Sequence, residues 1–331
     1  MKKETFNIHN YLRLSTAETN KDKFENYKII LDSGLYLSLK AHEMIEPSKR
    51  IEFLNDALIL FQMTVSKGIS IYNLANGLDY SNDIPDFTNS SNFKYIEPTA
   101  VSVLTRTQFE AFSTFHNIYN ANSDKNVKQI LFDLWVVAGL KERQRFVKED
   151  MLEQHKVKAN IERSKIDQII NRIELNPIYL GLSEDRKKLL KKQINGRKFQ
   201  FIFEDGDLKQ KGWSDLFLNA GINPMFKNLY SNMSLYGHPS NVSVFQFAQM
   251  FETNTNTSMT FSVMNNSRII LALLIADFCK FIPEAHSAFQ KLPRLNQMLI
   301  DFENRAFRGS KDFVTSLNHS QDIQVLEKQL R

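Results

Sequence analysis

The longest apolar run in the chain, IILALLIA at residues 269–276, constrains the fold most strongly. A transmembrane helix needs about 20 consecutive apolar residues, and this run is much shorter. We therefore interpret it as a central core helix, since a helix that is apolar on all sides is normally buried. The sequence accordingly predicts no membrane span and no membrane partner.

The residues that usually form turns are scarce, which favours long helices. The 331 residues include only 11 Gly and 8 Pro, against 26 Phe. A many-stranded β fold would need more turn-formers, whereas bulky apolar side chains suit helix packing. We find no repeat of fixed period and no Gly/Ser-rich or Pro-rich linker. The sequence predicts an all-α protein, a multi-helix bundle that forms a single domain over residues 1–331.

One segment departs from the helical pattern. In KFQFIFEDGDLK, which begins at Lys198, phenylalanine occupies every second position from 199 to 203. Asp205-Gly206 follows, and this pair favours the tight turn of a β-hairpin. We expect a small hairpin near 198–210, within an insertion or irregular connection that covers 177–223.

Local signals place several helix boundaries. Glu46-Pro47-Ser48 should end a first long helix, and Ser48 should cap the next, because a serine hydroxyl can accept from the free amides of a first turn. Residues 80–96 are polar and predict a loop. A helix is expected to start at Glu97-Pro98-Thr99 and to run to about 120. A short basic helix is expected over 183–194, and helices should resume near 224.

Three polar residues stand at spacings of four in LYSNMSLYGHPS, which begins at Leu229. They are Tyr230, Ser234 and His238. Residues four apart lie on the same face of a helix, so a helix through this segment would present a ladder of phenol, hydroxyl and imidazole. Such a ladder fits a buried hydrogen-bond network, a binding surface or part of a catalytic site, and the sequence does not choose among them.

A second polar stripe lies on the helix expected after Glu97. Arg106 and Glu110 are four apart, and Ser113 and Asn117 continue their stripe, almost opposite a face of apolar side chains. Read alone, this is a solvated face that carries a surface ion pair. A helix in the middle of a bundle could instead turn the stripe inward, onto a cleft.

The combination of R-x3-E in a Phe-rich helix with a later Y-x3-S-x3-H resembles an uncharacterised bacterial family of all-helical domains of unknown function. The matching positions are Arg106 and Glu110, then Tyr230, Ser234 and His238. The resemblance covers roughly residues 30–245. It implies a helical architecture in which the two stripes meet in space, and it implies no established reaction and no cofactor. The segment 198–215 is not part of the family's pattern.

Helical nucleases of the HEPN type from bacterial conflict systems use an arginine and a histidine without metal. The histidine moves the proton of the 2′-hydroxyl, and the arginine stabilises the charged phosphorane. Their usual signature places Arg four to six residues before His, and no histidine of this chain has that spacing. A ribonuclease would have to assemble Arg106 and His238 across helices. A Ser234–His238 nucleophilic pair lacks a G-x-S-x-G elbow.

The sequence predicts no metal site and no cofactor. The seven histidines are scattered without an HxxxH or HExxH pattern, and the single cysteine, Cys279, excludes an intramolecular disulfide and a CxxC site. Cys279 lies in an apolar run, where a free cysteine is usually a small buried hydrophobe. The simplest interpretation is a protein of the reducing cytoplasm. The N-terminus lacks the apolar segment of a secretory signal.

The net charge of +5 permits an acidic partner without requiring one. The expected basic helix offers nucleic acid a non-specific, salt-dependent contact, although such runs are mostly solvated helix faces. The residues concerned are Arg186, Lys187, Lys188, Lys191 and Lys192.

Three functions remain open, and the sequence does not decide whether the protein is an enzyme. The favoured hypothesis is a cytoplasmic binding or sensing module in a bacterial defence setting, with a polar cleft for an unknown ligand or protein partner. Tyr230, Ser234 and Arg106 would bind the ligand, with Arg106 as anchor for an anion such as a phosphorylated or nucleotide-like molecule. The enzyme alternative is a metal-independent ribonuclease with His238, Arg106 and Glu110 as catalytic residues. The third is a structural interaction protein whose polar ladder is only a network.

Overall fold

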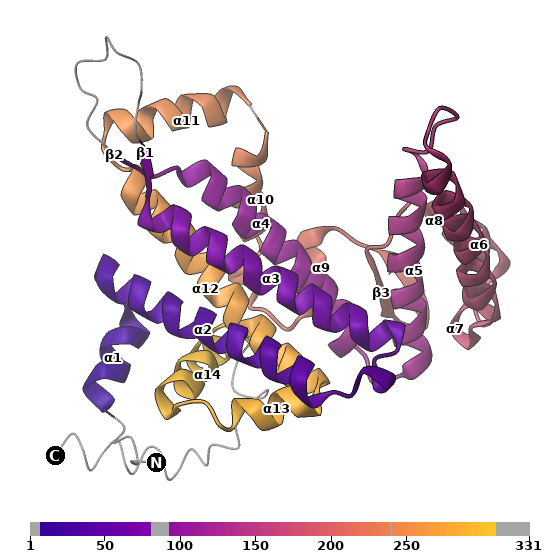
Figure 1. Cartoon of the computed structure of the whole chain (residues 1–331), viewed down its shortest axis with the longest axis horizontal. Coiled ribbons are helices and arrows are strands. Elements are labelled where there is room, and N and C mark those ends of the chain that lie inside the picture. The colour runs from indigo at the N-terminus through magenta and orange to yellow at the C-terminus, as the bar shows by residue number, and fades with distance from the viewer. Residues whose placement is uncertain (1–6, 81–92, 239, 309–331) are drawn as a thin grey trace. The chain divides into compact units, whose positions relative to one another are not determined.

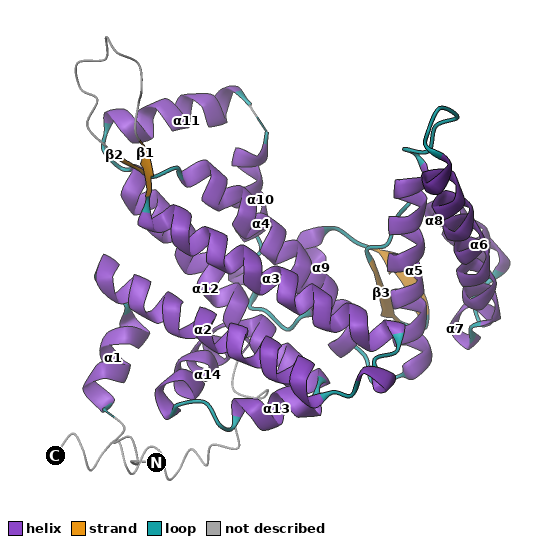
Figure 2. Cartoon of the chain, in the orientation of Figure 1, coloured by secondary structure: helices purple, strands orange, loops and turns teal. Residues whose placement is uncertain are grey.

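The computed structural model describes residues 7–80, 93–238 and 240–308. In these ranges the chain forms fourteen α-helices and two antiparallel sheets of two short strands each (Figure 2). The predicted all-α class with a small hairpin excursion is therefore confirmed. The chain divides into two compact units, unit 1 (1–115 and 221–331) and unit 2 (116–220). The single domain predicted over 1–331, with an insertion at 177–223, stays a prediction.

Unit 1 contains long helices from both halves of the chain (Figure 1). Its elements before the division are α1 (Ile8–Thr16), α2 (Asn20–Met44), the 3₁₀ turn η1 (Pro47–Lys49), α3 (Glu52–Asn76), β1 (Leu78–Tyr80), β2 (Phe93–Tyr95) and α4 (Pro98–Phe115). Those after it are η3 (Pro224–Phe226), α10 (Leu229–Ser234), η4 (Leu235–Gly237), α11 (Asn241–Glu252), α12 (Asn256–Phe281), α13 (Pro283–Phe289) and α14 (Arg294–Arg308).

The apolar run at 269–276 lies in α12, and every residue of the run is buried. Among the residues that the structure describes, α12 is the one helix long and apolar enough to cross a membrane, but 78% of its most apolar window is buried inside the protein. This burial is typical of a core helix and agrees with the interpretation from the sequence.

A buried polar network joins α2, α3, α4 and α12 in this core. The Tyr27 hydroxyl donates to the Gly68 carbonyl oxygen at 3.0 Å and lies 2.9 Å from Ser267 Oγ. Ser267 Oγ donates to the Gln108 amide oxygen, and Gln108 Nε2 donates to the Thr64 carbonyl oxygen at 3.0 Å. Burial of the phenol raises the pKa of Tyr27, so the hydroxyl keeps its proton. Such a satisfied network fixes the register of the four helices against one another.

The helices cross closely at Gly68 of α3. A Cβ atom at this position would lie 2.9 Å from Leu31 Cδ1 and 3.0 Å from Leu271 Cδ1, which is closer than real Cβ contacts normally allow. The missing side chain therefore lets α2 and α12 approach α3. Since α4 packs mainly against α12 and α3, this close crossing also positions α4.

Unit 2 comprises the residues between the two parts of unit 1. Its elements are a π-helical turn η2 (His116–Asn120), α5 (Lys125–Gln144), α6 (Glu153–Leu175), α7 (Pro177–Leu180), α8 (Glu184–Asn195), β3 (Phe201–Glu204), β4 (Asp207–Gln210) and α9 (Trp213–Asn219). The expected basic helix is α8, and Ser183 caps it by accepting from the Arg186 amide.

The hairpin predicted near 198–210 is present as β3 and β4. Phe201 pairs with Gln210 and Glu204 with Asp207, so that a two-residue turn connects the strands. Both turn residues have positive φ, 55° at Asp205 and 76° at Gly206, as the predicted turn pair requires. Asn117 Nδ2 donates to the Phe201 carbonyl oxygen at 2.7 Å and ties this strand to η2.

Two boundary predictions are wrong or incomplete. Ser48 does not cap α3, because residues 47–49 form a 3₁₀ turn and the residue before α3 is Ile51, which makes no side-chain cap. The guanidinium of Arg50 instead donates to carbonyl oxygens at the end of α2. The loop predicted over 80–96 is flanked by the strands β1 and β2, and its residues 81–92 lie outside the described part of the chain.

Candidate functional site

The polar residues Arg106 and Glu110 face α10 of the same unit. Arg106 Nε donates to Glu110 Oε1 at 3.1 Å, and Arg106 Nη2 donates to the Tyr230 hydroxyl oxygen at 3.0 Å. The Tyr230 hydroxyl in turn donates to Glu110 Oε1 at 3.0 Å. These three side chains therefore form a closed ring of hydrogen bonds, which we call the polar triangle. It joins α4 to α10 across a sequence separation of 120 residues or more.

Aromatic contacts support the polar triangle. The Arg106 guanidinium carbon lies 5.2 Å from the centre of the Tyr230 ring, and this ring lies 5.3 Å from that of Phe109. The side chains of Arg106 and Glu110 are each 25% exposed. A cation above a partly buried ring is stabilising, so the guanidinium is held by charge, hydrogen bonds and ring contact together.

The protonation states follow from this environment. Burial raises the pKa of Tyr230, and Glu110 raises it further, against the opposing effect of Arg106. The phenol therefore stays protonated and can donate to the carboxylate. Burial lowers the pKa of Arg106, but Tyr230 and Glu110 more than offset this effect, so the pKa is raised overall and the side chain is cationic.

The interpretation of the α4 polar stripe as a solvated face is wrong. Ser113 and Asn117, which continue this stripe, are buried with exposed fractions of 0% and 4%. Ser113 is buried because α4 is packed on several sides by α3, α12 and α10, whereas Asn117 lies in η2 and donates to the Phe201 carbonyl oxygen. The alternative, a stripe turned inward, describes the structure better.

The predicted ladder holds for one step only. The α-helix α10 ends at Ser234, η4 follows, and His238 has extended backbone angles of −136° and 143°. A residue that precedes proline is disfavoured in the helical region, and the sequence has Pro239 next. Ser234 Oγ donates to the Tyr230 carbonyl oxygen at 2.8 Å, as serines in helices often do. The His238 side chain is exposed, so the structure offers no Ser234–His238 pair.

Residues just before His238 lie against the polar triangle. A Cβ atom at Gly237 would come within 2.8 Å of Arg106 Nη1. The backbone of η4 therefore packs on the guanidinium, and the small size of Gly237 permits this approach. Among the described residues the hydrogen bonds of Arg106 are made by Nε and Nη2, whereas Nη1 lies against the Gly237 backbone.

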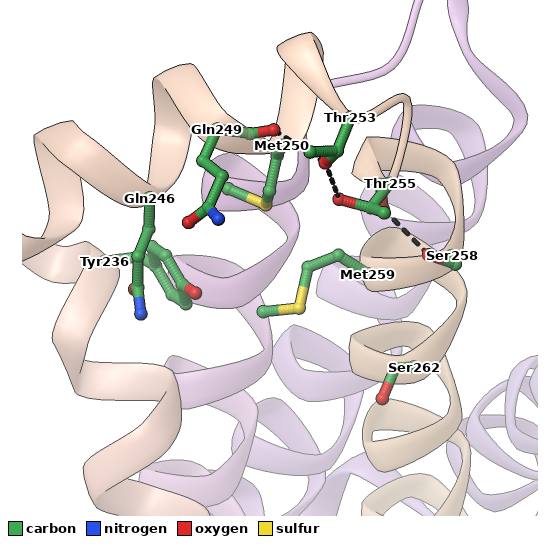
Figure 3. A pocket seen from close by; sticks show the side chains of 9 residues that line it. All are labelled: Tyr236, Gln246, Gln249, Met250, Thr253, Thr255, Ser258, Met259 and Ser262. Carbon is green, nitrogen blue, oxygen red and sulfur yellow. Dashed lines mark hydrogen bonds between the residues drawn. The ribbon is translucent and has the colours of Figure 1, made fainter.

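A pocket of about 620 Å³ lies on unit 1 between α11 and α12, with η4 at one side (Figure 3). Hydroxyl, amide, thioether and phenol groups line it, and none of the lining residues carries a charge. The lining residues are Tyr236, Gln246, Gln249, Met250, Thr253, Thr255, Ser258, Met259 and Ser262. None of the five residues predicted from the sequence lines this pocket.

The turn between α11 and α12 shapes one end of the pocket. Asn254 has a positive φ of 53°, and the Thr255 amide donates back to the Met250 carbonyl oxygen at 2.8 Å. Thr253 Oγ1 donates to the Gln249 carbonyl oxygen at 2.7 Å and lies 2.9 Å from Thr255 Oγ1. Ser258 Oγ donates to the Thr255 carbonyl oxygen at 2.9 Å. These bonds give the hydroxyl end of the pocket a defined geometry.

The other end of the pocket carries a buried amide without a partner. Gln246 Oε1 is inaccessible to solvent and accepts no hydrogen bond from the described residues. Leaving a buried acceptor unpaired costs about 1–3 kcal/mol. Figure 3 shows the Gln246 side chain beside the Tyr236 ring, whose hydroxyl has a pKa raised by burial. Because this oxygen is covered, a ligand in the pocket can reach it only after the Gln246 side chain changes its rotamer.

A pattern in the sequence could have indicated the α11 side of this pocket. Gln246, Gln249, Met250 and Thr253 follow the spacing of one helix face within an otherwise apolar helix. The remaining lining residues come from η4 and the first turns of α12. Only the tertiary structure brings these to the same place.

The predicted nucleic-acid contact residues lie on α8 in unit 2. Three of the five are paired with acidic groups: Arg186 with Asp207, Lys187 with Glu184 and Lys191 with Glu174. Lys188 and Lys192 are exposed and form no ion pair with the described residues. Unit 2 carries 20 Lys and Arg against 15 Asp and Glu, so its +5 equals the net charge of the whole chain.

Metal-binding groups do not gather in the residues that the structure describes, where no three His, Cys, Asp or Glu side chains lie close enough to hold an ion. Cys279 is buried, and burial raises the pKa of its thiol.

Comparison with known proteins identifies a domain family. A family of unknown function (DUF5677) matches residues 96–256. The expected similarity to an uncharacterised domain family is therefore confirmed. The matching stretch, 96–256, begins and ends later in the sequence than the predicted stretch of about 30–245. The match contains all of α4, unit 2, α10 and α11. No curated protein and no solved structure matches the chain.

Proposed function

We propose that the protein is a binding module whose ligand occupies the pocket between α11 and α12. The observation that carries this proposal is a pocket of about 620 Å³ whose lining combines two thioethers and a phenol ring with neutral hydroxyl and amide groups. Binding sites for small molecules usually have volumes of roughly 300–1,000 Å³ and combine apolar walls with a few polar groups. The two Met side chains and the neutral polar groups of this pocket provide that combination.

The polar triangle supports this pocket rather than lining it. Arg106 and Glu110 hold Tyr230 at 3.0 Å and thereby hold α10 on α4. The chain then continues through Ser234 into η4, where Tyr236 forms a pocket wall and Gly237 packs on Arg106. Arg106, Tyr230 and Ser234 would therefore position the site instead of binding the ligand, which changes the role that the sequence suggested for them.

The arrangement also suits a sensing role. Among the elements of unit 1, α11 packs mainly against η4, and residues of both elements line the pocket. A ligand bound between α11 and α12 would add contacts that tie the two helices together. Binding would then lower the mobility of α11, as expected when a ligand favours one conformation of a protein.

Blocking the pocket tests this proposal. Ser262 is an exposed pocket residue, so Ser262→Trp should fill the pocket with an indole ring and leave the core intact. We expect a screen of small molecules of mixed charge to yield compounds that raise the Tm of the wild type, with no shift for Ser262→Trp. A ligand at 100 times its Kd stabilises a protein by about 2.7 kcal/mol, which is readily measured.

The matched control is Ser66→Trp, at an exposed serine of α3 outside the pocket, which should respond to ligand as the wild type does. Compounds that stabilise Ser262→Trp equally well, or a screen without any binder, would contradict the proposal.

A metal-independent ribonuclease is the second candidate, favoured by the contact between Gly237 and Arg106. His238 follows Gly237 directly in the sequence, and its side chain is exposed to solvent. If this candidate is right, the protein should degrade single-stranded RNA in EDTA, and His238→Ala should lose the activity by 10²-fold or more, as for a general acid or base. Intact RNA after prolonged incubation would exclude it and leave the binding module.

A further inference from the structure

The pocket between α11 and α12 has no charged lining residue, which restricts the chemistry of its ligand. All nine lining side chains are neutral at physiological pH. A phosphate, carboxylate or ammonium group would therefore meet no opposite charge among the lining side chains of this pocket. The ligand should therefore be uncharged in the part that enters the pocket.

Two amides provide the hydrogen-bonding capacity of the α11 wall. Gln246 Oε1 has no donor among the described residues, and the Gln249 side chain is exposed where it lines the pocket. A glutamine amide presents one donor and one acceptor side by side, and this geometry matches the edge of a nucleobase, which offers an acceptor next to an N–H donor.

The walls between the two ends suit a flat ring. In Figure 3 the side chains of Met250 from α11 and Met259 from α12 extend into the space between these helices. Thioethers pack favourably on aromatic rings, and Tyr236 adds a ring of its own at the end where Gln246 lies. A heteroaromatic base fits such walls better than a sugar alone, whose faces are largely polar.

Hydroxyl groups gather at the opposite end of the pocket. Figure 3 places Thr253, Thr255 and Ser258 together on the side away from Tyr236. Their hydroxyls already donate to carbonyl oxygens or to one another, so each retains acceptor capacity. The hydroxyl groups of a sugar can donate to these oxygens, which gives a sugar attached to the base a place to bind.

We infer that the pocket between α11 and α12 binds an uncharged nucleoside, with the base between Met250 and Met259 and the sugar at the hydroxyl end. The base edge hydrogen-bonds to the amides of Gln246 and Gln249. This inference rests on the proposed function, because it names the ligand of the same pocket. It differs from the phosphorylated ligand suggested by the sequence, since Arg106 does not line the pocket.

The test is calorimetric titration of the full chain with adenosine, guanosine, cytidine and uridine, each beside its 5′-monophosphate and beside ribose. We expect at least one nucleoside to bind, its monophosphate to bind tenfold or more weakly, and ribose not to bind measurably. Gln246→Met keeps the length of the side chain and removes the amide. It should lower the affinity for the nucleoside by tenfold or more. Gln62→Met, at an exposed position of α3, should leave the affinity unchanged.

Each contrary outcome points to a different error. A monophosphate that binds more tightly than its nucleoside, or ribose that binds as well, would overturn the assignment of the ligand class. Compounds from the mixed-charge screen that bind the wild type but not Ser262→Trp, with no nucleoside among them, would also overturn it and would leave the proposed function standing. If neither the screen nor the nucleosides bind, the proposed function itself fails.

Discussion

Replacing Arg308 with methionine is expected to lower the free energy of unfolding of unit 1 by about 3–5 kcal/mol, as when one partner of a buried ion pair is removed. The Arg308 guanidinium donates to both carboxylate oxygens of Asp277 on α12, at 2.7 and 2.9 Å, and it lies 5.4 Å from the centre of the Phe112 ring on α4. The two charged side chains are only 5% and 2% exposed. The substitution would remove the cation that binds both oxygens of this buried carboxylate.

The measurement is urea unfolding followed by far-UV circular dichroism. Both tryptophans, Trp135 and Trp213, lie in unit 2, so tryptophan fluorescence reports on that unit and should change much less than the circular dichroism. Lys28→Met is the matched control, because it breaks the Lys28–Asp32 pair, in which both side chains are more than half exposed. It should cost less than about 1 kcal/mol.

A second variant separates the loss of charge pairing from other effects. Arg308→Met combined with Asp277→Leu removes both charges, and buried ion pairs replaced by apolar side chains are often neutral or stabilising. The double variant should therefore recover most of the stability lost in Arg308→Met. A cost below about 1 kcal/mol for the single variant would show that Asp277 is not buried in solution as it is in the structure.

The second large effect is expected for Phe61→Ala, at about 3–5 kcal/mol, the usual cost of removing a buried phenylalanine ring. Phe61 of α3 stacks on Phe278 of α12 with ring centres 3.7 Å apart and an angle of 11° between the rings. Both residues have an exposed fraction of 0%. The cavity would lie at the contact between the two helices that pack on α4, so it would weaken the support of the polar triangle as well.

The same unfolding measurement applies, with Phe245→Ala as control. Phe245 is on α11 and is 65% exposed, so its removal should change the stability by less than about 0.5 kcal/mol. The free energy of unfolding of Phe61→Leu should lie between those of Phe61→Ala and Phe245→Ala, because leucine fills part of the cavity. Equal stability of Phe61→Ala and Phe245→Ala would contradict the packing of α3 on α12 described above.

Features that depend on neighbouring residues were predictable from the sequence. The core helix around the apolar run at 269–276, the Asp205-Gly206 turn and the short basic helix expected over 183–194 each depend on nearby positions, and the structure confirms all three. The Ser48 cap is wrong because Pro47 favours a short 3₁₀ turn, which moves the start of the next helix to Glu52. Pro47 therefore indicates the end of the first long helix correctly, but the next helix begins four residues after Ser48.

The candidate site depended on tertiary contacts that the sequence does not contain. The spacing of Arg106 and Glu110 predicted their pairing, but only the position of α10 brings the Tyr230 hydroxyl to the same carboxylate. The predicted ladder includes His238 on the assumption that the helix continues through η4. In the structure, however, His238 has the backbone angles of an extended strand. The pocket was missed because its lining residues come from separate elements.

The close packing of α4 on α12 and α3 has a consequence for the stretch that matches the domain family. Residues 96–256 include α4 but leave out α2, α3, α14 and all of α12 beyond its first residue. Phe109, Phe112 and Phe115 of α4, each with an exposed fraction of 0%, would lose these neighbours in an excised fragment. The stretch that matches the family thus contains α4 without most of the helices that bury it, so its borders in sequence do not coincide with the borders of unit 1.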